Sequence, residues 1–191
     1  LSRRMKQEGF DWLKNQNTER VTITSRDGLS ICGHYLPAQS PSARCALLIH
    51  GYRGTSGREE MGWLSRVYHR MGFNVLMPDN RAHGESDGQY LGMGWLDRDD
   101  CTLWIEYLTK TQGPDAQILL HGVSMGAAAA IMAFSVAVTL GSSRWMSVPL
   151  RPSLASTLII LPLKETVAPS FSSTRKWVSS LLLPITSPPG G

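Results

Sequence analysis

Cysteine is scarce in this 191-residue sequence, and its three copies lie far apart. No two of them have the C-x-x-C spacing that is typical of zinc sites and redox motifs, and three thiols are too few for a disulfide framework. Cys32, Cys45 and Cys101 each fall in an apolar or amphipathic stretch, which predicts buried free thiols. We therefore expect a reducing compartment, the cytoplasm, and neither a metal site nor a cofactor.

Long apolar runs are absent as well. Residues 127–140 form the most apolar helix candidate, but Ser135 and Thr139 interrupt it, and its roughly 14 residues fall short of the roughly 20 that span a bilayer. No secretory signal opens the chain. The first residue is Leu1 and not methionine. Membrane contact through an anchor or signal segment upstream of these residues therefore stays an open alternative.

A concentrated basic surface is also missing. The formal net charge is +4 and the isoelectric point is about 9.2, but the excess of basic residues lies beyond residue 134. Acidic and basic residues balance in residues 1–134, and no basic stripe with interleaved aromatics occurs there, which argues against a nucleic-acid partner. We expect a small-molecule ester or peptide substrate as partner, and nothing in the composition indicates an oligomeric state.

Histidine does not occur after residue 121, and aspartate does not occur after residue 115. Residues 135–191 contain 12 serines and 7 prolines, and Glu165 is their only acid. This composition, without a regular period, predicts irregular structure. Two explanations are open: a segment translated in a wrong reading frame or joined from elsewhere, and a genuine tail that contacts a membrane surface or a partner through residues 175–177 and 181–183.

Residues 1–134, in contrast, alternate between strand and helix patterns. Two alternating segments flank Asp27-Gly28, a dipeptide typical of hairpin turns. Short apolar runs, typical of strands buried on both faces, alternate with segments of helical period. The pattern predicts an α/β domain with a mostly parallel sheet and an antiparallel N-terminal hairpin. The expected strands are 20–25, 29–37, 45–49, 73–77 and 117–120, and the expected helices are 2–15, 59–71, 94–110 and one that begins near 127.

One of these strands ends abruptly in Gly122-Val123-Ser124-Met125-Gly126, and four alanines follow. Because alanine is the strongest helix former, Ser124 is predicted to lie on a sharp strand-to-helix turn. Small residues two positions before and two after the serine let the strand and the helix approach each other. The same letters match G-x-x-x-G, a packing motif of membrane helices, but the apolar segment is too short for that interpretation.

This turn resembles the nucleophile elbow of alpha/beta hydrolases, and two upstream segments match that superfamily in the same order. His50-Gly51-Tyr52-Arg53-Gly54, after a buried strand, is similar to its oxyanion loop. Residues 81–88 are close to its R-G-H-G-x-S-x-G loop, with Ala82 in place of a glycine. The resemblance covers residues 28–133, and within the superfamily it is strongest to bacterial prolyl-oligopeptidase-like and serine-aminopeptidase-like hydrolases.

The resemblance implies hydrolysis of carboxylic esters, peptides or amides. By this resemblance Ser124 is the nucleophile that attacks a carbonyl group, and the backbone amides of Tyr52 and Met125 bind the oxyanion. It further implies that His50 supports its loop and does not serve as the triad base. Ser86 is predicted to be a turn hydroxyl and not a second nucleophile.

The triad acid and base have no counterpart in the expected place. In this superfamily both follow the serine in chain order, whereas all five histidines precede it: His34, His50, His69, His83 and His121. Asp97, Asp99 and Asp100 open a predicted helix, where acids suit the helix dipole. Three hypotheses remain: a serine hydrolase whose acid and base this chain lacks, a non-catalytic pseudohydrolase that binds a ligand or partner, and a truncated product with no function of its own.

Overall fold

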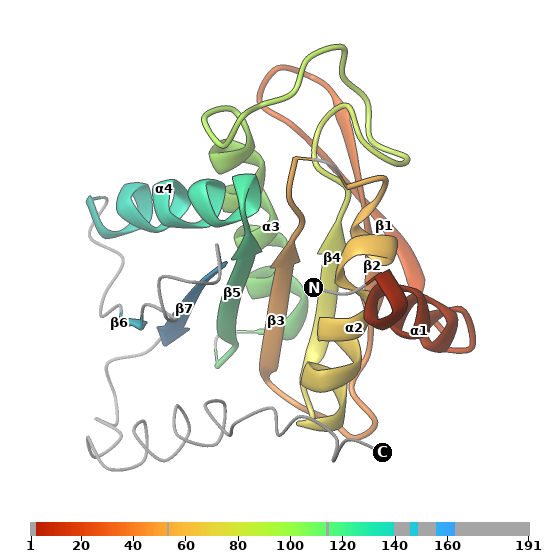
Figure 1. Ribbon diagram of the computed structural model, residues 1–191. Coiled ribbons are helices and arrows are strands. Elements are labelled where there is room, and N and C mark those ends of the chain that lie inside the picture. The colour runs from red at the N-terminus through yellow and green to blue at the C-terminus, as the bar shows by residue number, and fades with distance from the viewer. Residues whose placement is uncertain (1–2, 53, 114, 140–145, 149–155, 163–191) are drawn as a thin grey trace.

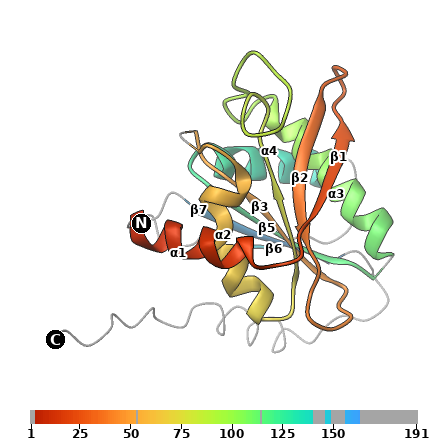
Figure 2. The same cartoon turned by 90° about the vertical axis from the view of Figure 1, so that its right-hand side faces the viewer.

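The computed structural model describes residues 3–52, 54–113, 115–139, 146–148 and 156–162, in which helices cover both faces of a seven-stranded sheet (Figures 1 and 2). The strands are β1 (Glu19–Thr24), β2 (Ser30–Leu36), β3 (Arg44–Ile49), β4 (Asn74–Pro78), β5 (Gln117–Val123), β6 (Met146–Val148) and β7 (Ser156–Pro162). The helices are α1 (Arg3–Lys14), α2 (Gly57–Arg70), α3 (Asp97–Gln112) and α4 (Met125–Thr139). The α/β class predicted from the sequence is confirmed.

The strand order is β1-β2-β4-β3-β5-β7-β6. β3 lies parallel to β4 and to β5, whereas β2 runs antiparallel to both β1 and β4. This arrangement confirms the parallel central strands and the antiparallel N-terminal hairpin that the sequence predicts, and β7 and β6 continue the sheet beyond β5 as antiparallel strands. Residues 45–49, 75–77 and 118–120 are at most 1% exposed, as expected for strands covered on both faces.

The core has two parts, one on each face of the sheet. On one face, α1 and α2 pack against the sheet through a cluster that includes Leu13, Met61 and Tyr68. On the other face, α3 and α4 pack through a cluster that includes Trp104 and Ala129 (Figure 2). Each face of the sheet therefore buries the apolar side of two helices.

Helix α3 begins at Asp97, three residues later than the sequence pattern predicts. Met93 and Gly94 have φ values of 48° and 83°, which no α-helix accommodates. A Cβ atom at Gly94 would lie 3.1 Å from the Ala128 Cβ atom of α4. The segment before α3 is thus a left-handed bend that packs on α4, and close approach to another helix decided its conformation.

The division of the chain at residue 134 stays a prediction, whereas short parts of the segment predicted to be irregular form regular structure. Helix α4 crosses that boundary without a break, and β7 pairs antiparallel with β5 along its whole length, from Gln117↔Pro162 to Val123↔Ser156. Unpaired backbone groups on β5 would form an exposed sheet edge, and β7, which contains the apolar residues 158–161, supplies a strand that covers it. Glu165 and residues 175–177 and 181–183 lie outside the described residues.

Helix length bears on the membrane question. In the part of the chain that the structure describes, no helix is both long enough and apolar enough to cross a bilayer.

Candidate active site

Ser124 occupies the turn between β5 and α4 and has a φ of 54°. Left-handed backbone is rare for residues other than glycine and costs about 1–2 kcal/mol. It occurs here because an extended strand must reverse into a helix within one residue. The sequence prediction of a sharp strand-to-helix turn at Ser124 is confirmed.

The two glycines around Ser124 are required by close backbone contacts. A Cβ atom at Gly122 would lie 2.2 Å from the carbonyl oxygen of Gly126, and a Cβ atom at Gly126 would lie 2.2 Å from the carbonyl oxygen of Ile49. Real Cβ atoms do not approach backbone oxygens this closely. The G-x-S-x-G spacing therefore lets the elbow fold on itself and also press against the end of β3.

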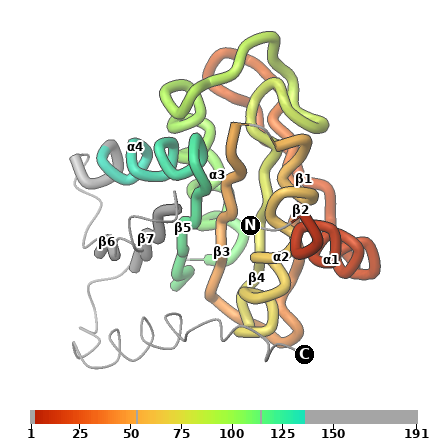
Figure 3. Tube along the Cα trace, viewed as in Figure 1, coloured from red at the N-terminus to blue at the C-terminus, as the bar shows by residue number. Residues whose placement is uncertain are grey.

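Because β3 and β5 are parallel neighbours, the loop after β3 and the elbow after β5 lie at the same edge of the sheet (Figure 3). A Cβ atom at Gly51 would lie 3.3 Å from the Cβ atom of Ser124. The loop turns tightly, with the Gly54 N–H donating to the Gly51 carbonyl at 3.1 Å. Residues 73 positions apart in the chain, Gly51 and Ser124, thus meet at one point.

The structure brings the Tyr52 and Met125 amides to this region. Met125 is the first residue of α4, so its N–H is one of the helix-opening amides that have no acceptor inside the helix. Tyr52 follows Gly51 in the loop that touches the elbow, and no acceptor for its N–H lies among the described residues. Both amides therefore lie on segments that meet at the elbow.

His50 is fully buried and holds two loops together. The Asn80 N–H donates to its Nε2 atom at 3.0 Å, so Nδ1 carries the proton, and it lies 2.9 Å from the Gly51 carbonyl oxygen. The Asn80 side chain also donates to the His50 carbonyl at 3.0 Å. Burial lowers the pKa of His50. Both ring nitrogens are occupied by backbone groups, which agrees with the supporting role predicted for this histidine.

His83 connects the loop after β4 to the loop that contains Tyr52. Its ring nitrogens lie 3.2 Å from the Tyr52 carbonyl oxygen and 3.0 Å from the Arg81 carbonyl oxygen. A neutral ring has one N–H, so it donates to one of these acceptors at a time. The adjacent Ala82, which stands where the superfamily loop has a glycine, has left-handed backbone with a φ of 59°.

The other three histidines face away from the elbow. His121 lies on β5, and its Nδ1 atom is 2.8 Å from the Tyr68 hydroxyl of α2; burial lowers its pKa to about 4. His69 is near the Pro37 carbonyl, and His34 is near Glu85. No contact recorded within the described residues joins any of the five histidines to Ser124.

Asp79 and Asn80, which follow β4, are site residues that the sequence analysis did not single out. The Asp79 carboxylate accepts the Gly57 N–H at 2.6 Å and the Glu85 N–H at 2.8 Å, and so joins the start of α2 to the glycine-rich loop. A Cβ atom at Gly84 would collide with this carboxylate. Polar residues immediately after a buried parallel strand are the signal that could have found them.

Ser86 and the acids at the start of α3 have structural contacts. The Ser86 hydroxyl accepts the Cys32 N–H at 2.8 Å and donates to the Asp79 carbonyl at 2.7 Å, as predicted for a turn hydroxyl. Asp100 forms a bidentate pair with buried Arg81, with both distances 2.9 Å. Asp97 accepts the Gly94 N–H, and Asp99 lies 3.7 Å from Arg26.

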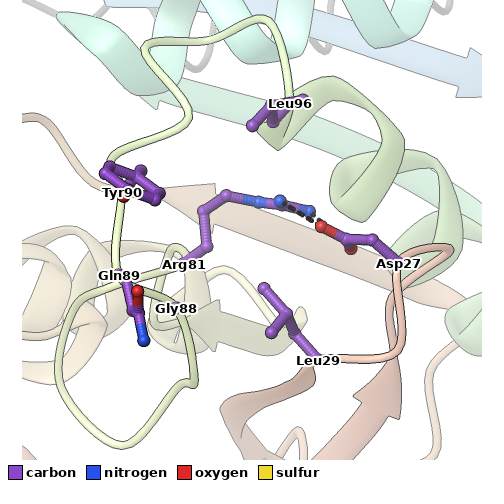
Figure 4. A pocket seen from close by; sticks show the side chains of 7 residues that line it. All are labelled: Asp27, Leu29, Arg81, Gly88, Gln89, Tyr90 and Leu96. Carbon is purple, nitrogen blue, oxygen red and sulfur yellow. Dashed lines mark hydrogen bonds and ion pairs between the residues drawn. The ribbon is translucent and has the colours of Figure 1, made fainter.

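A pocket lies beside the Arg81–Asp27 ion pair and is separate from the elbow (Figure 4). Tyr90 and Leu96, both exposed, stand at its rim. The Arg81 guanidinium is shared between the carboxylates of Asp27 and Asp100, so it offers the pocket no uncompensated charge. None of Ser124, Tyr52 or Met125 lines this pocket, and it takes no part in the candidate active site.

Comparisons with known proteins agree with this geometry. A family model described as "Alpha/beta hydrolase family" matches residues 46–187. Among curated proteins, the chain is 36% identical over 118 residues to the multifunctional-autoprocessing repeats-in-toxin of Vibrio cholerae serotype O1, a match that covers 57% of this chain and 2% of the toxin.

Solved structures show the same similarity. The esterase Pf2001 of Pyrococcus furiosus superposes with a TM-score of 0.54 and 28% identity, over 63% of this chain and 47% of the esterase. An alpha-beta hydrolase from Vibrio vulnificus superposes with a TM-score of 0.56 and 25% identity, over 72% of this chain and 46% of that chain. The chain thus spans less than half the length of these two solved relatives.

Proposed function

Because the chain belongs to the alpha/beta hydrolase family, we propose that it carries the nucleophile and oxyanion-binding part of a serine hydrolase for carboxylic esters or amides. The nucleophile is Ser124, and the amides of Tyr52 and Met125 bind the oxyanion. One structural relative is named an esterase, which favours esters over peptides as substrates.

The observation that carries this proposal is the left-handed backbone of Ser124 beside the Gly51 loop. Strained backbone at a non-glycine residue destabilises the fold. It is typical of functional sites, where the surrounding structure holds the residue in that conformation. The strain exposes the serine hydroxyl above the end of β5, where a carbonyl carbon can reach it. The contact with Gly51 sets the oxyanion loop next to the same point.

The chemistry follows from these positions. When the Ser124 hydroxyl oxygen adds to the substrate carbonyl carbon, negative charge develops on the carbonyl oxygen. The Met125 N–H lies at the positive end of the α4 dipole, which favours that charge. The Tyr52 N–H supplies a second donor from the opposite loop, so that the oxyanion is bound between two preorganised amides.

Proton transfer is the step for which the described residues provide no group. The histidines that follow β3 and β4 are bonded to backbone carbonyls and amides, and His121 is bonded to Tyr68. An unactivated serine hydroxyl is a weak nucleophile at neutral pH. Loss of the base forfeits a factor of about 10⁴–10⁶ in rate, so the 191-residue chain alone is expected to be nearly inactive.

A fluorophosphonate probe, which reacts with activated serines, tests the proposal. The 191-residue chain should label no faster than its Ser124→Ala variant. A chimera in which the residues after α4 are replaced by the acid- and histidine-bearing C-terminal part of an alpha/beta hydrolase should label, hydrolyse p-nitrophenyl esters, and lose both properties on Ser124→Ala. Ser30→Ala, at an exposed strand position, is the matched control and should leave labelling unchanged.

Two outcomes would contradict these assignments. Labelling of the chimera that survives Ser124→Ala would exclude Ser124 as the nucleophile. Ester turnover by the 191-residue chain that Ser124→Ala abolishes would mean that His50, His83 or His121 acts as the base, against the structural role given to each.

The second candidate function is that of a non-catalytic binding protein. The ring nitrogens of His50 and His83 already lie against backbone groups. The elbow is therefore intact, but neither histidine is free to accept the serine proton, which favours a binding role. In that case the 191-residue chain should bind a non-hydrolysable ester analogue, such as the corresponding ether, without turning over esters, and Ser124→Ala should leave that binding unchanged.

A further inference from the structure

We propose that Cys32, His34 and Glu85 form a binding site for a zinc ion. Cys32 and His34 are alternate residues of β2, so their side chains leave the same face of the sheet. Glu85 comes from the loop after β4 and lies over that face. Their ligand atoms all fall within 4.8 Å of one another.

The distances suit a shared tetrahedral ion. The His34 Nε2 atom lies 3.3 Å from a Glu85 carboxylate oxygen, and the Cys32 sulfur lies 3.9 Å from the other oxygen. Zinc bonds of about 2.0–2.1 Å to nitrogen or oxygen and 2.3 Å to sulfur place such ligand pairs about 3.3 Å and 3.6 Å apart. The two measured distances are within a few tenths of an ångström of these values, and the remaining pair, Cys32 and His34, lies within 4.8 Å.

A second observation points to a ligand at this place. His34 is 4% exposed, and its Nε2 atom, although 3.3 Å from a Glu85 carboxylate oxygen, makes no hydrogen bond in the described part of the chain. Buried nitrogen atoms are nearly always bonded, so an exception calls for an explanation such as an absent ion.

The donor set selects the metal. A thiolate with an imidazole favours zinc over magnesium or calcium, which require oxygen ligands. Zinc binds cysteine as the thiolate, so coordination forms the zinc–sulfur bond and releases the thiol proton to solvent. Glu85 is 43% exposed, which leaves an entry path and room for a water molecule as fourth ligand.

Two arginines oppose the ion. The Arg20 Nε donates to Glu85 at 2.6 Å, and an Arg58 nitrogen lies 3.6 Å from the same carboxylate. The thiolate and the carboxylate balance the charge of the ion, but each guanidinium repels it. Removal of a guanidinium should therefore have the opposite effect to removal of a ligand. Arg58→Gln should strengthen zinc binding several-fold, whereas loss of a ligand should weaken it.

The test is the zinc content and affinity of the purified chain, after removal of any histidine tag. We expect about one zinc per chain after dialysis, measured by mass spectrometry of the metal, and competition with a chromophoric chelator gives the affinity. Cobalt should give the charge-transfer band of a cobalt–thiolate bond. Cys32→Ser and Glu85→Gln should each lower the zinc affinity by more than the roughly 10–100-fold that loss of an outer-shell contact costs, and Cys32→Ser should abolish the band.

Cys45→Ser and Cys101→Ser are the matched controls, because both thiols are buried but lie outside this cluster. They should keep the zinc and the cobalt band. Because Glu85 is exposed, Glu85→Gln leaves the core unchanged. Loss of zinc binding in this variant therefore does not reflect misfolding. Absence of zinc binding in the parent chain, or full binding in both Cys32→Ser and Glu85→Gln, overturns the proposal.

Discussion

Gly126 is the residue at which helix propensity and packing predict opposite effects of one mutation. It is the second residue of α4, where Gly126→Ala would gain about 1 kcal/mol from propensity alone. The added Cβ atom, however, would lie 2.2 Å from the Ile49 carbonyl oxygen and 2.6 Å from the His50 carbonyl oxygen.

The packing cost is expected to be larger than the gain. Both obstructing atoms belong to the backbone at the end of β3, a strand paired on both sides, so no side chain can turn away to make room. Overpacking of this kind costs about 1–3 kcal/mol, and we take the upper end because the backbone must shift. The net destabilisation is then about 2 kcal/mol, which lowers the melting temperature by about 4–8 °C for a domain of this size.

Urea and thermal unfolding of purified Gly126→Ala would measure this difference. Ala128→Gly, two residues further along the same helix, is the matched control, since it changes propensity by about 1 kcal/mol without introducing a clash. The chimera described above should also label more slowly when it carries Gly126→Ala, because the elbow and the oxyanion loop move apart. Gly126→Ala with stability equal to or above that of the parent would refute the close packing of α4 on β3.

Three further predictions concern stability. Asp100→Asn leaves the buried Arg81 guanidinium without its buried partner and should lower the free energy of unfolding by about 3–5 kcal/mol. Asp27→Asn removes the exposed partner of Arg81 and should lower it by less than about 1 kcal/mol. Equal losses for the two variants in urea unfolding would be inconsistent with burial of the Arg81–Asp100 pair. Ala82→Gly should be neutral or stabilise by up to about 1 kcal/mol, since relief of the left-handed strain outweighs the added entropy of the unfolded chain; a clear loss of melting temperature would contradict that backbone assignment. Burial lowers the pKa of His121 from 6.5 to about 4, so the unfolded state takes up a proton below pH 6.5 that the folded state refuses. The free energy of unfolding should therefore fall by about 3 kcal/mol between pH 6.5 and pH 4, and His121→Asn should flatten this dependence; an unchanged pH profile would assign the titration to another group.

Periodicity predicted most of the fold because it reports which faces are buried. The apolar runs at residues 45–49 and 118–120 were identified as strands covered on both faces, and the structure buries them completely. The start of α3 was predicted too early, because the bend at Met93 and Gly94 depends on contact with α4 and not on local preference. Strand β7 was missed for a related reason: an apolar segment in a proline-rich region becomes a strand only when β5 offers it a partner.

The sequence by itself determined the elbow, because a strand, two glycines, a serine and a run of alanines specify a sharp turn through local backbone preferences. It also determined the order in which the loop after β3 and the glycine-rich loop precede Ser124. Only the tertiary structure decided which groups meet there. Gly51 lies against Ser124, the Asn80 N–H donates to His50, and Glu85 meets Cys32 and His34. Each of these contacts arises because strands distant in the chain pair with one another. Such contacts depend on sheet order and register, which local sequence patterns do not encode.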